Sequence, residues 1–110
     1  MIRATTPKHT FIFETDPNVF SRILVTYAQK DKIVLEKEKE DLTIEELADM
    51  ACGDTGYCAW FRMTQEETKK FDARYPVQLQ VRVLTTSGEA LASDKKTLSV
   101  LDVLNDEVLL

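Results

Sequence analysis

The sequence predicts an all-β sandwich of about six or seven strands with one or two short helices. Residues 22–29, 56–63 and 77–83 alternate between apolar and polar side chains, as strands with one buried face do. The longest such pattern runs from Arg74 to Val100 and is interrupted at Ser87-Gly88, which is typical of a β-hairpin. The C-terminal half of the chain is therefore predicted to build a sheet.

The length and charge of the chain limit the classes of protein to which it can belong. Its 110 residues indicate one domain that buries roughly two-thirds of the surface of its unfolded chain. The net charge of −5 argues against nucleic acid as a partner. No apolar run approaches the ~20 residues of a membrane helix, and no signal-peptide core is seen. We expect no membrane association and a cytoplasmic location, unless the protein leaves as part of a larger particle.

The first predicted strand covers residues 10–15, with Phe11 and Phe13 on one face. Asp16-Pro17 then begins a helical turn, because Asp can cap a helix and Pro suits its first position. The second strand covers residues 22–29.

A two-residue turn at Lys30-Asp31 leads to the third predicted strand, residues 32–39. Strict alternation places Ile33 and Leu35 inward and Glu36 and Glu38 outward.

In the middle of the chain, the spacing of the apolar residues changes from that of a strand to that of a helix. Thr43 and Glu46 match a capping box, and the apolar residues of 44–51 have helical spacing, so we expect a short helix there. Residues 56–63 return to a strand with apolar side chains on both faces, which indicates a strand that is central or covered on both sides.

Thr64 and Glu67 form a second capping box, which predicts a short helical turn as far as Phe71. Pro76 then begins the fifth strand, and we expect this strand at a sheet edge, where a missing amide is tolerated. Residues 90–101 run back, with Leu98 and Val100 inward. The predicted core contains Phe11, Phe13, Ile23, Val25, Leu35, Phe61, Leu79, Val81 and Val83.

We divide the chain into a sandwich domain, residues 1–101, and an apolar and acidic tail, residues 102–110. The leucine and valine side chains of the tail gain nothing while they are exposed. They are expected to pack either on their own domain or on a neighbouring molecule.

No residue pattern indicates catalysis, a cofactor or a metal. His9 is the only histidine and has no partner at triad or metal-ligand spacing, so a surface or strand-edge position is expected. Cys52 and Cys58 are separated by five residues and are expected to be free thiols, although a turn between them would allow a disulfide. We therefore predict that the protein is not an enzyme.

The candidate interaction residues are apolar and aromatic. Tyr57 and Trp60 are the candidates for a ligand platform, although alternation places them on opposite faces of their strand. In the tail, the candidates are Leu104, Val108 and Leu109.

Four segments, residues 2–11, 23–29, 63–68 and 77–85, together with Ala92-Ser93, resemble short prophage-encoded proteins of Gram-positive bacteria. These look like the immunoglobulin-like β-sandwich domains of phage baseplate and tail proteins. The resemblance implies an immunoglobulin-like fold without catalytic residues, and a virion structural or assembly component that contacts other virion proteins or itself. It also implies the cytoplasm of the bacterial host, and the virion, as the location.

An alternative function is a carbohydrate- or ligand-binding module without catalysis. The chain departs from the family between Asp41 and Gly56, where the family has a short loop or hairpin and this sequence predicts a helix.

Overall fold

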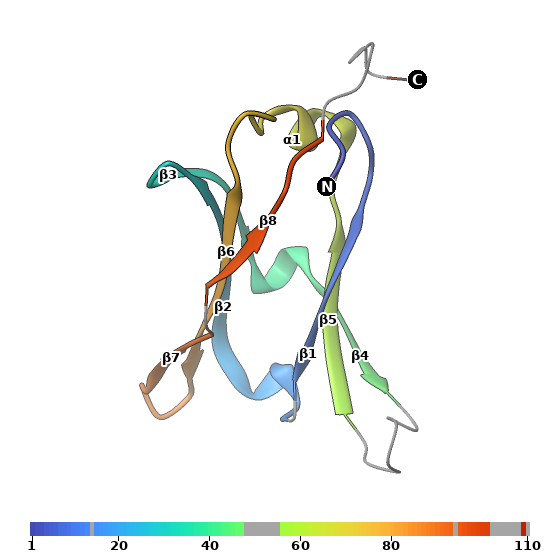
Figure 1. Ribbon diagram of the computed structural model, residues 1–110. Helices are drawn as coiled ribbons and strands as arrows, with labels where there is room; N and C mark the ends of the chain where they lie inside the picture. Colours follow the sequence, from blue (N-terminus) through green and yellow to red (C-terminus); the bar gives the residue numbers. More distant parts are fainter. Residues whose placement is uncertain (14, 48–55, 94, 102–108, 110) are drawn as a thin grey trace.

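A computed structural model describes residues 1–13, 15–47, 56–93, 95–101 and 109. Two antiparallel sheets face each other, one with the strand order β1-β5-β4 and one with the order β3-β2-β6-β7, in which β8 also pairs with β6 (Figure 1). The strands are β1 (Lys8–Phe13), β2 (Phe20–Gln29), β3 (Lys32–Glu38), β4 (Thr43–Leu47), β5 (Gly56–Arg62), β6 (Val77–Thr85), β7 (Ala90–Ala92) and β8 (Lys96–Leu98). Three short helices connect them: η1 (Pro17–Val19), η2 (Lys39–Asp41) and α1 (Gln65–Lys69). The predicted all-β sandwich is confirmed.

The order of the strands is that of an immunoglobulin-like sandwich. In that fold strands B, E and D form one sheet, and C′, C, F and G form the other. Here β1, β5 and β4 take the places of B, E and D, while β3, β2 and β6 take those of C′, C and F. Strand G is divided into β7 and β8, and strand A has no counterpart among the described strands.

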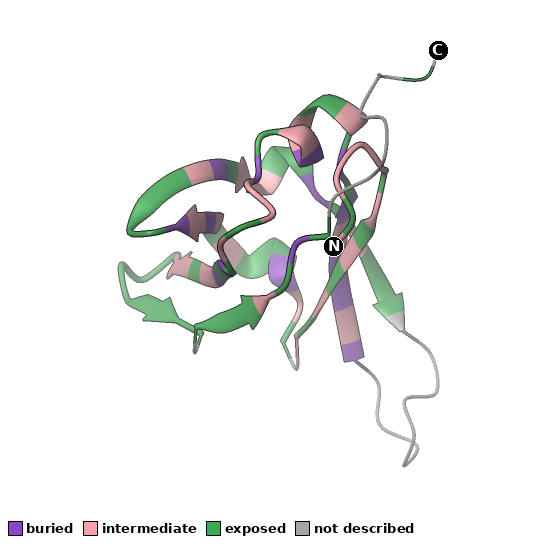
Figure 2. Ribbon diagram, turned by 45° about the horizontal axis from the view of Figure 1, so that its top comes forward, coloured by how far each residue is buried: buried purple, intermediate pink, exposed green. Residues whose placement is uncertain are grey.

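The core lies between the two sheets. Ile23, Val25 and Tyr27 alternate along β2 and are fully buried, as their spacing predicts. Buried residues gather where the strands face each other, and exposed residues cover the turns and outer faces (Figure 2). Of the predicted core, Ile23, Val25, Leu35, Phe61 and Leu79 are buried, and Phe11, Phe13, Val81 and Val83 are half-buried and pack against them.

Local capping explains where the predicted helical turns begin. A carboxylate oxygen of Asp16 accepts a hydrogen bond from the backbone N–H of Asn18 at 2.9 Å, and Pro17 is the first residue of η1. At α1, the hydroxyl oxygen of Thr64 accepts from the N–H of Glu67 at 3.1 Å, and the Glu67 carboxylate accepts from the N–H of Thr64 at 2.9 Å. The second predicted capping box is therefore confirmed.

The first predicted capping box is wrong, because its residues form a strand. Thr43 to Leu47 pair with β5 in an antiparallel register that runs from Thr43 opposite Trp60 to Leu47 opposite Gly56. Local helix propensity is a weak preference, and the backbone hydrogen bonds offered by the central strand outweigh it. Residues 48–51 of the predicted helix lie outside the described residues.

The predicted inward position of Ile33 is also wrong. The β2–β3 register shifts between Tyr27, opposite Leu35, and Ala28, opposite Ile33. Val34 is therefore an extra residue, and such a β-bulge breaks the alternation of side chains. Leu35 remains buried, whereas 61% of the surface of Ile33 is exposed.

The fifth predicted strand is not at an edge. Strand β6 pairs with β2 on one side and with β7 and β8 on the other. Pro76 precedes the strand, so its missing N–H removes no hydrogen bond from the sheet. The predicted return strand is divided in two, and Leu98 is half-buried and Val100 buried, as expected.

Candidate functional site

The histidine lies between the sheets rather than at the surface. His9 is on β1, an edge strand, but its half-buried ring points inward. Its Nδ1 atom lies 2.5 Å from the hydroxyl oxygen of Tyr27, and its ring meets that of Phe61 edge-on with centroids 5.9 Å apart. The predicted surface or strand-edge position is therefore confirmed as a strand-edge position, with the ring turned toward the core.

Burial keeps both members of this pair neutral. It lowers the pKa of His9 below its usual 6.5 and raises the pKa of the Tyr27 hydroxyl. A neutral imidazole and a neutral phenol form one hydrogen bond and require no counter-ion. The pair therefore acts as a polar link between the sheets.

A groove of about 600 Å³ opens on one side of the sandwich, between β1 and the strands β6, β7 and β8. We call it the edge groove. It is lined by Thr10, Phe11, Ile12, Phe13, Phe20, Leu79, Val81, Val83, Leu91, Ala92, Ser93 and Lys96. The lining is mainly apolar and aromatic, which is the usual character of binding sites in proteins.

The side chains of the edge groove come from strands with predictable alternation. Phe11 and Phe13 point inward from β1, and Val81 and Val83 point toward them from β6. These four side chains are only half-buried because no described strand closes the sandwich at this side. Part of the predicted core is therefore also the wall of an open groove.

The backbone along the edge groove is also open. The N–H of Met63 donates to the carbonyl oxygen of Pro7 at 3.0 Å, and hydrogen-bonded pairs in an antiparallel ladder recur at every second residue. The backbone groups of Lys8, Thr10 and Ile12 therefore point away from β5. No described strand pairs with them, so β1 presents a free sheet edge beside an apolar groove.

Exposed apolar residues flank the edge groove. Ile12 on β1 is 56% exposed and Leu91 on β7 is 47% exposed. Lys96 on β8 lines the groove and is exposed as well. Contiguous apolar surface with a polar rim is typical of interaction sites.

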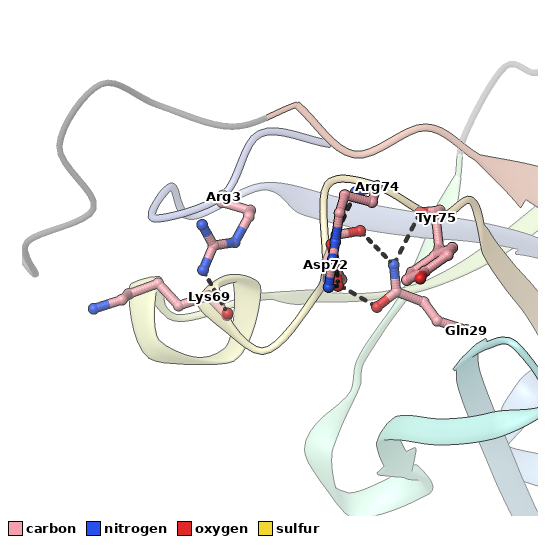
Figure 3. A network of polar contacts seen from close by, with 6 residues as sticks. All are labelled: Arg3, Gln29, Lys69, Asp72, Arg74 and Tyr75. Carbon is pink, nitrogen blue, oxygen red and sulfur yellow. Dashed lines mark hydrogen bonds and ion pairs between the residues drawn. The ribbon is translucent and has the colours of Figure 1, made fainter.

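A second polar cluster lies at the end of β2, and its contacts are structural (Figure 3). The amide nitrogen of buried Gln29 donates to the carbonyl oxygens of Asp72 at 2.8 Å and Tyr75 at 3.0 Å. Its amide oxygen accepts from the N–H of Asp72 at 2.9 Å. Arg74 binds the Asp72 carboxylate, and a guanidinium nitrogen of Arg3 donates to the carbonyl oxygen of Lys69 at 3.0 Å. These bonds hold the segment between α1 and β6 against the end of β2.

The predicted aromatic residues do not form one platform. Tyr57 and Trp60 lie on opposite faces of β5, as alternation predicts. The Nζ atom of Lys8 lies 4.2 Å from the centroid of the Trp60 ring, so a cation already covers one face of the indole. The side chain of Trp60 is partly buried.

The predicted tail residues are only partly within the described chain. Leu104 and Val108 lie outside the described residues, as does Cys52, whereas Cys58 is a buried free thiol. Leu109 is 73% exposed. Its backbone N–H donates to the amide oxygen of Gln65 at 2.7 Å, and its carbonyl oxygen accepts from the Gln65 amide nitrogen at 2.8 Å.

The sequence shows the side chains of the edge groove but not that the groove is open. Phe11 and Phe13 alternate on one face of the first predicted strand and require cover. Which strand lies beside them depends on pairing between residues that are distant in the sequence.

Within the described ranges, no group of three or more His, Cys, Asp or Glu residues has the arrangement of a metal site. No helix among the described residues is long and apolar enough to cross a membrane. No protein-family model and no curated protein matches the sequence.

Proposed function

We propose that this chain is a structural or assembly component of a bacteriophage particle, encoded by a prophage, and that it acts through protein–protein contacts without catalysis. The observation that carries the proposal is the edge groove beside the free edge of β1. A free edge supplies backbone hydrogen bonds to an extended partner segment, and an apolar groove receives its side chains.

The free edge of β1 beside the groove supports a protein partner over a small substrate. The groove is lined mainly by apolar side chains, with Thr10, Ser93 and Lys96 as its polar members. An extended polypeptide can use both this lining and the backbone groups of the edge. Proteins normally protect a free edge with charge, proline or cover, because it pairs readily with other chains. The resemblance to prophage proteins supplies the biological setting, namely the host cytoplasm during assembly and then the virion.

The test is association with phage particles from induced host cells that carry a tagged copy of the chain. Leu91→Arg places a charge in the edge groove at an exposed position, so the fold should survive. Ile33→Arg changes another exposed apolar residue, on the far edge strand β3, and serves as the matched control.

Wild type and Ile33→Arg should sediment with particles or with assembly intermediates. Leu91→Arg should be depleted by at least about tenfold, which corresponds to about 1.4 kcal/mol of lost contact. Absence of the wild-type chain from particles and from every assembly complex would contradict the proposal.

One observation favours the second candidate function, carbohydrate binding at Trp60. The indole nitrogen of Trp60 is buried and has no hydrogen-bond partner among the described residues. A sugar hydroxyl would satisfy this donor once a side-chain movement exposed it. Binding on a glycan array that is lost in Trp60→Phe would support this function, and binding that is unchanged would exclude Trp60 as the site.

A further inference from the structure

We propose that the edge groove receives residues 102–110 of a second copy of this chain, added as a strand along β1. This inference rests on the proposed function and names the partner for the same groove. The addition would complete the sandwich, because strand A of an immunoglobulin-like fold lies beside strand B, the place that β1 takes here.

The length of the segment suits the groove. Strand β1 has six residues, which span about 20 Å at the rise of an extended chain. Residues 102–110 would span about 30 Å in the same conformation. The backbone groups of Lys8, Thr10 and Ile12 that face away from β5 are available to pair with such a strand.

The side chains of the segment suit the groove when they alternate. In an extended conformation Asp102, Leu104, Asp106, Val108 and Leu110 share one face. The three apolar side chains match the apolar lining, and Asp106 brings an acid to the groove that Lys96 lines. This complementarity favours an acidic and apolar strand over a neutral one.

The opposite face of the added strand meets charge as well. It carries Glu107, and it lies beside the outer face of β1, where Lys8 is exposed.

The position of Leu109 indicates that the strand comes from another copy. Its backbone is bonded to Gln65 on α1, and α1 lies at the end of the sandwich away from β7, where Leu91 lines the groove (Figure 1). Leu109 is therefore held away from the part of its own groove that Leu91 lines. A segment from a second copy, released from the half-buried Gln65, meets a free edge.

The test is the molar mass of the full chain, measured by light scattering and sedimentation equilibrium over a range of concentrations. Lys96→Glu and Asp106→Lys each set like charges against each other in the groove. Each should weaken self-association by at least about tenfold. Lys95→Glu reverses the charge of an exposed neighbour that does not line the groove, and it should associate like wild type.

Mixing the two groove variants is the decisive experiment. In a mixture, the acidic groove of the Lys96→Glu chain accepts the basic strand of the Asp106→Lys chain. The unchanged groove of the Asp106→Lys chain likewise accepts the unchanged strand of the Lys96→Glu chain. Association should therefore return to within about threefold of wild type in the mixture, although each variant alone stays monomeric. The double variant Lys96→Glu with Asp106→Lys should associate as well.

Two results would overturn the inference. One is a wild-type chain that stays monomeric up to about 1 mM, where even weak association is seen. The other is association that neither charge reversal weakens. In both cases depletion of Leu91→Arg from phage particles would still support the proposed function, with a strand from a different virion protein as the occupant.

Discussion

The Nδ1 atom of His9 and the hydroxyl oxygen of Tyr27 lie 2.5 Å apart and join β1 of one sheet to β2 of the other. The tyrosine ring also meets Phe61 and Phe71 edge-on, with centroids 6.1 and 5.9 Å apart. Apolar contacts between sheets have little directionality, whereas this hydrogen bond has a defined geometry. It therefore specifies how the sheets are aligned. In antibody domains the strand equivalent to β2 carries a buried tryptophan.

Removing the hydroxyl from this pair should destabilise the protein. Tyr27→Phe leaves the Nδ1 atom of His9 without its partner in the core, which costs about 1–3 kcal/mol. Chemical denaturation should show this loss. The double variant His9→Leu with Tyr27→Phe removes both polar groups, so its cost should be smaller than the sum of the single costs. Additive costs would show that the contact contributes nothing.

The stability of the protein should fall as the pH falls from about 7.5 to 5.5. Burial lowers the pKa of His9 in the folded state, so the unfolded state takes up a proton first. Stability is fully present above the unfolded pKa of 6.5 and is lost as the pH falls toward the folded pKa. Melting temperatures across this range should show the slope, and His9→Gln should remove it.

Two acidic residues affect the stability of the protein in a lower pH range than His9 does. Hydrogen bonds from Arg74 lower the pKa of Asp72 to about 2. Partial burial raises the pKa of Glu67, but hydrogen bonds from Lys37 and Thr64 together outweigh it, so the pKa is lowered. The contributions of both carboxylates are present above the unfolded pKa values and are lost as the pH falls through the folded ones. A slope near pH 6 that persists in His9→Gln would contradict the assignment to His9.

The bulge in the β2–β3 hairpin predicts different costs for two neighbouring residues. Leu35→Ala should destabilise by about 2–5 kcal/mol, because Leu35 is buried. Ile33→Ala should change stability by no more than about 0.5 kcal/mol, because Ile33 is exposed. Urea unfolding of both variants measures the difference. Equal costs would place Ile33 in the core and exclude the bulge.

Replacing Gln29 should loosen the segment between α1 and β6. Gln29→Leu keeps the size of the side chain but leaves backbone groups of Asp72 and Tyr75 without partners. We expect a loss of about 2–4 kcal/mol and faster hydrogen exchange at the N–H of Asp72. Gln78→Leu, at an exposed position on β6, is the control and should change little. Unchanged exchange at Asp72 would argue against these bonds.

Residues that prefer positive φ angles should stabilise the two-residue turn between β2 and β3. Lys30 and Asp31 have φ angles of 49° and 63°, as a type I′ turn requires, and Asn-Gly is preferred in such turns. Lys30→Asn with Asp31→Gly should therefore stabilise the protein by about 0.5–1 kcal/mol. A rise in melting temperature is the readout. The same Asn-Gly pair at Glu36-Lys37, within β3, should destabilise it.

Much of the fold could be predicted from the sequence alone, because strand alternation, helix caps and tight turns depend on residues that are close in the chain. Alternation along residues 22–29 and 77–83 correctly placed Ile23, Val25 and Leu79 inward, since successive side chains of a strand point to opposite faces. The capping box at Thr64 and the turn at Lys30-Asp31 could also be predicted, since both depend on residues close in sequence.

Only the tertiary structure decided which strands distant in the sequence pair and where the sandwich stays open. Residues 43–47 carry a helix signal, yet the backbone of β5 pairs with them and makes them a strand. His9 has no partner in sequence, and the packing of two sheets brings it to Tyr27. The edge groove exists because no described strand covers β1. All three depend on contacts between distant residues, and alternation along one strand carries no information about its neighbour.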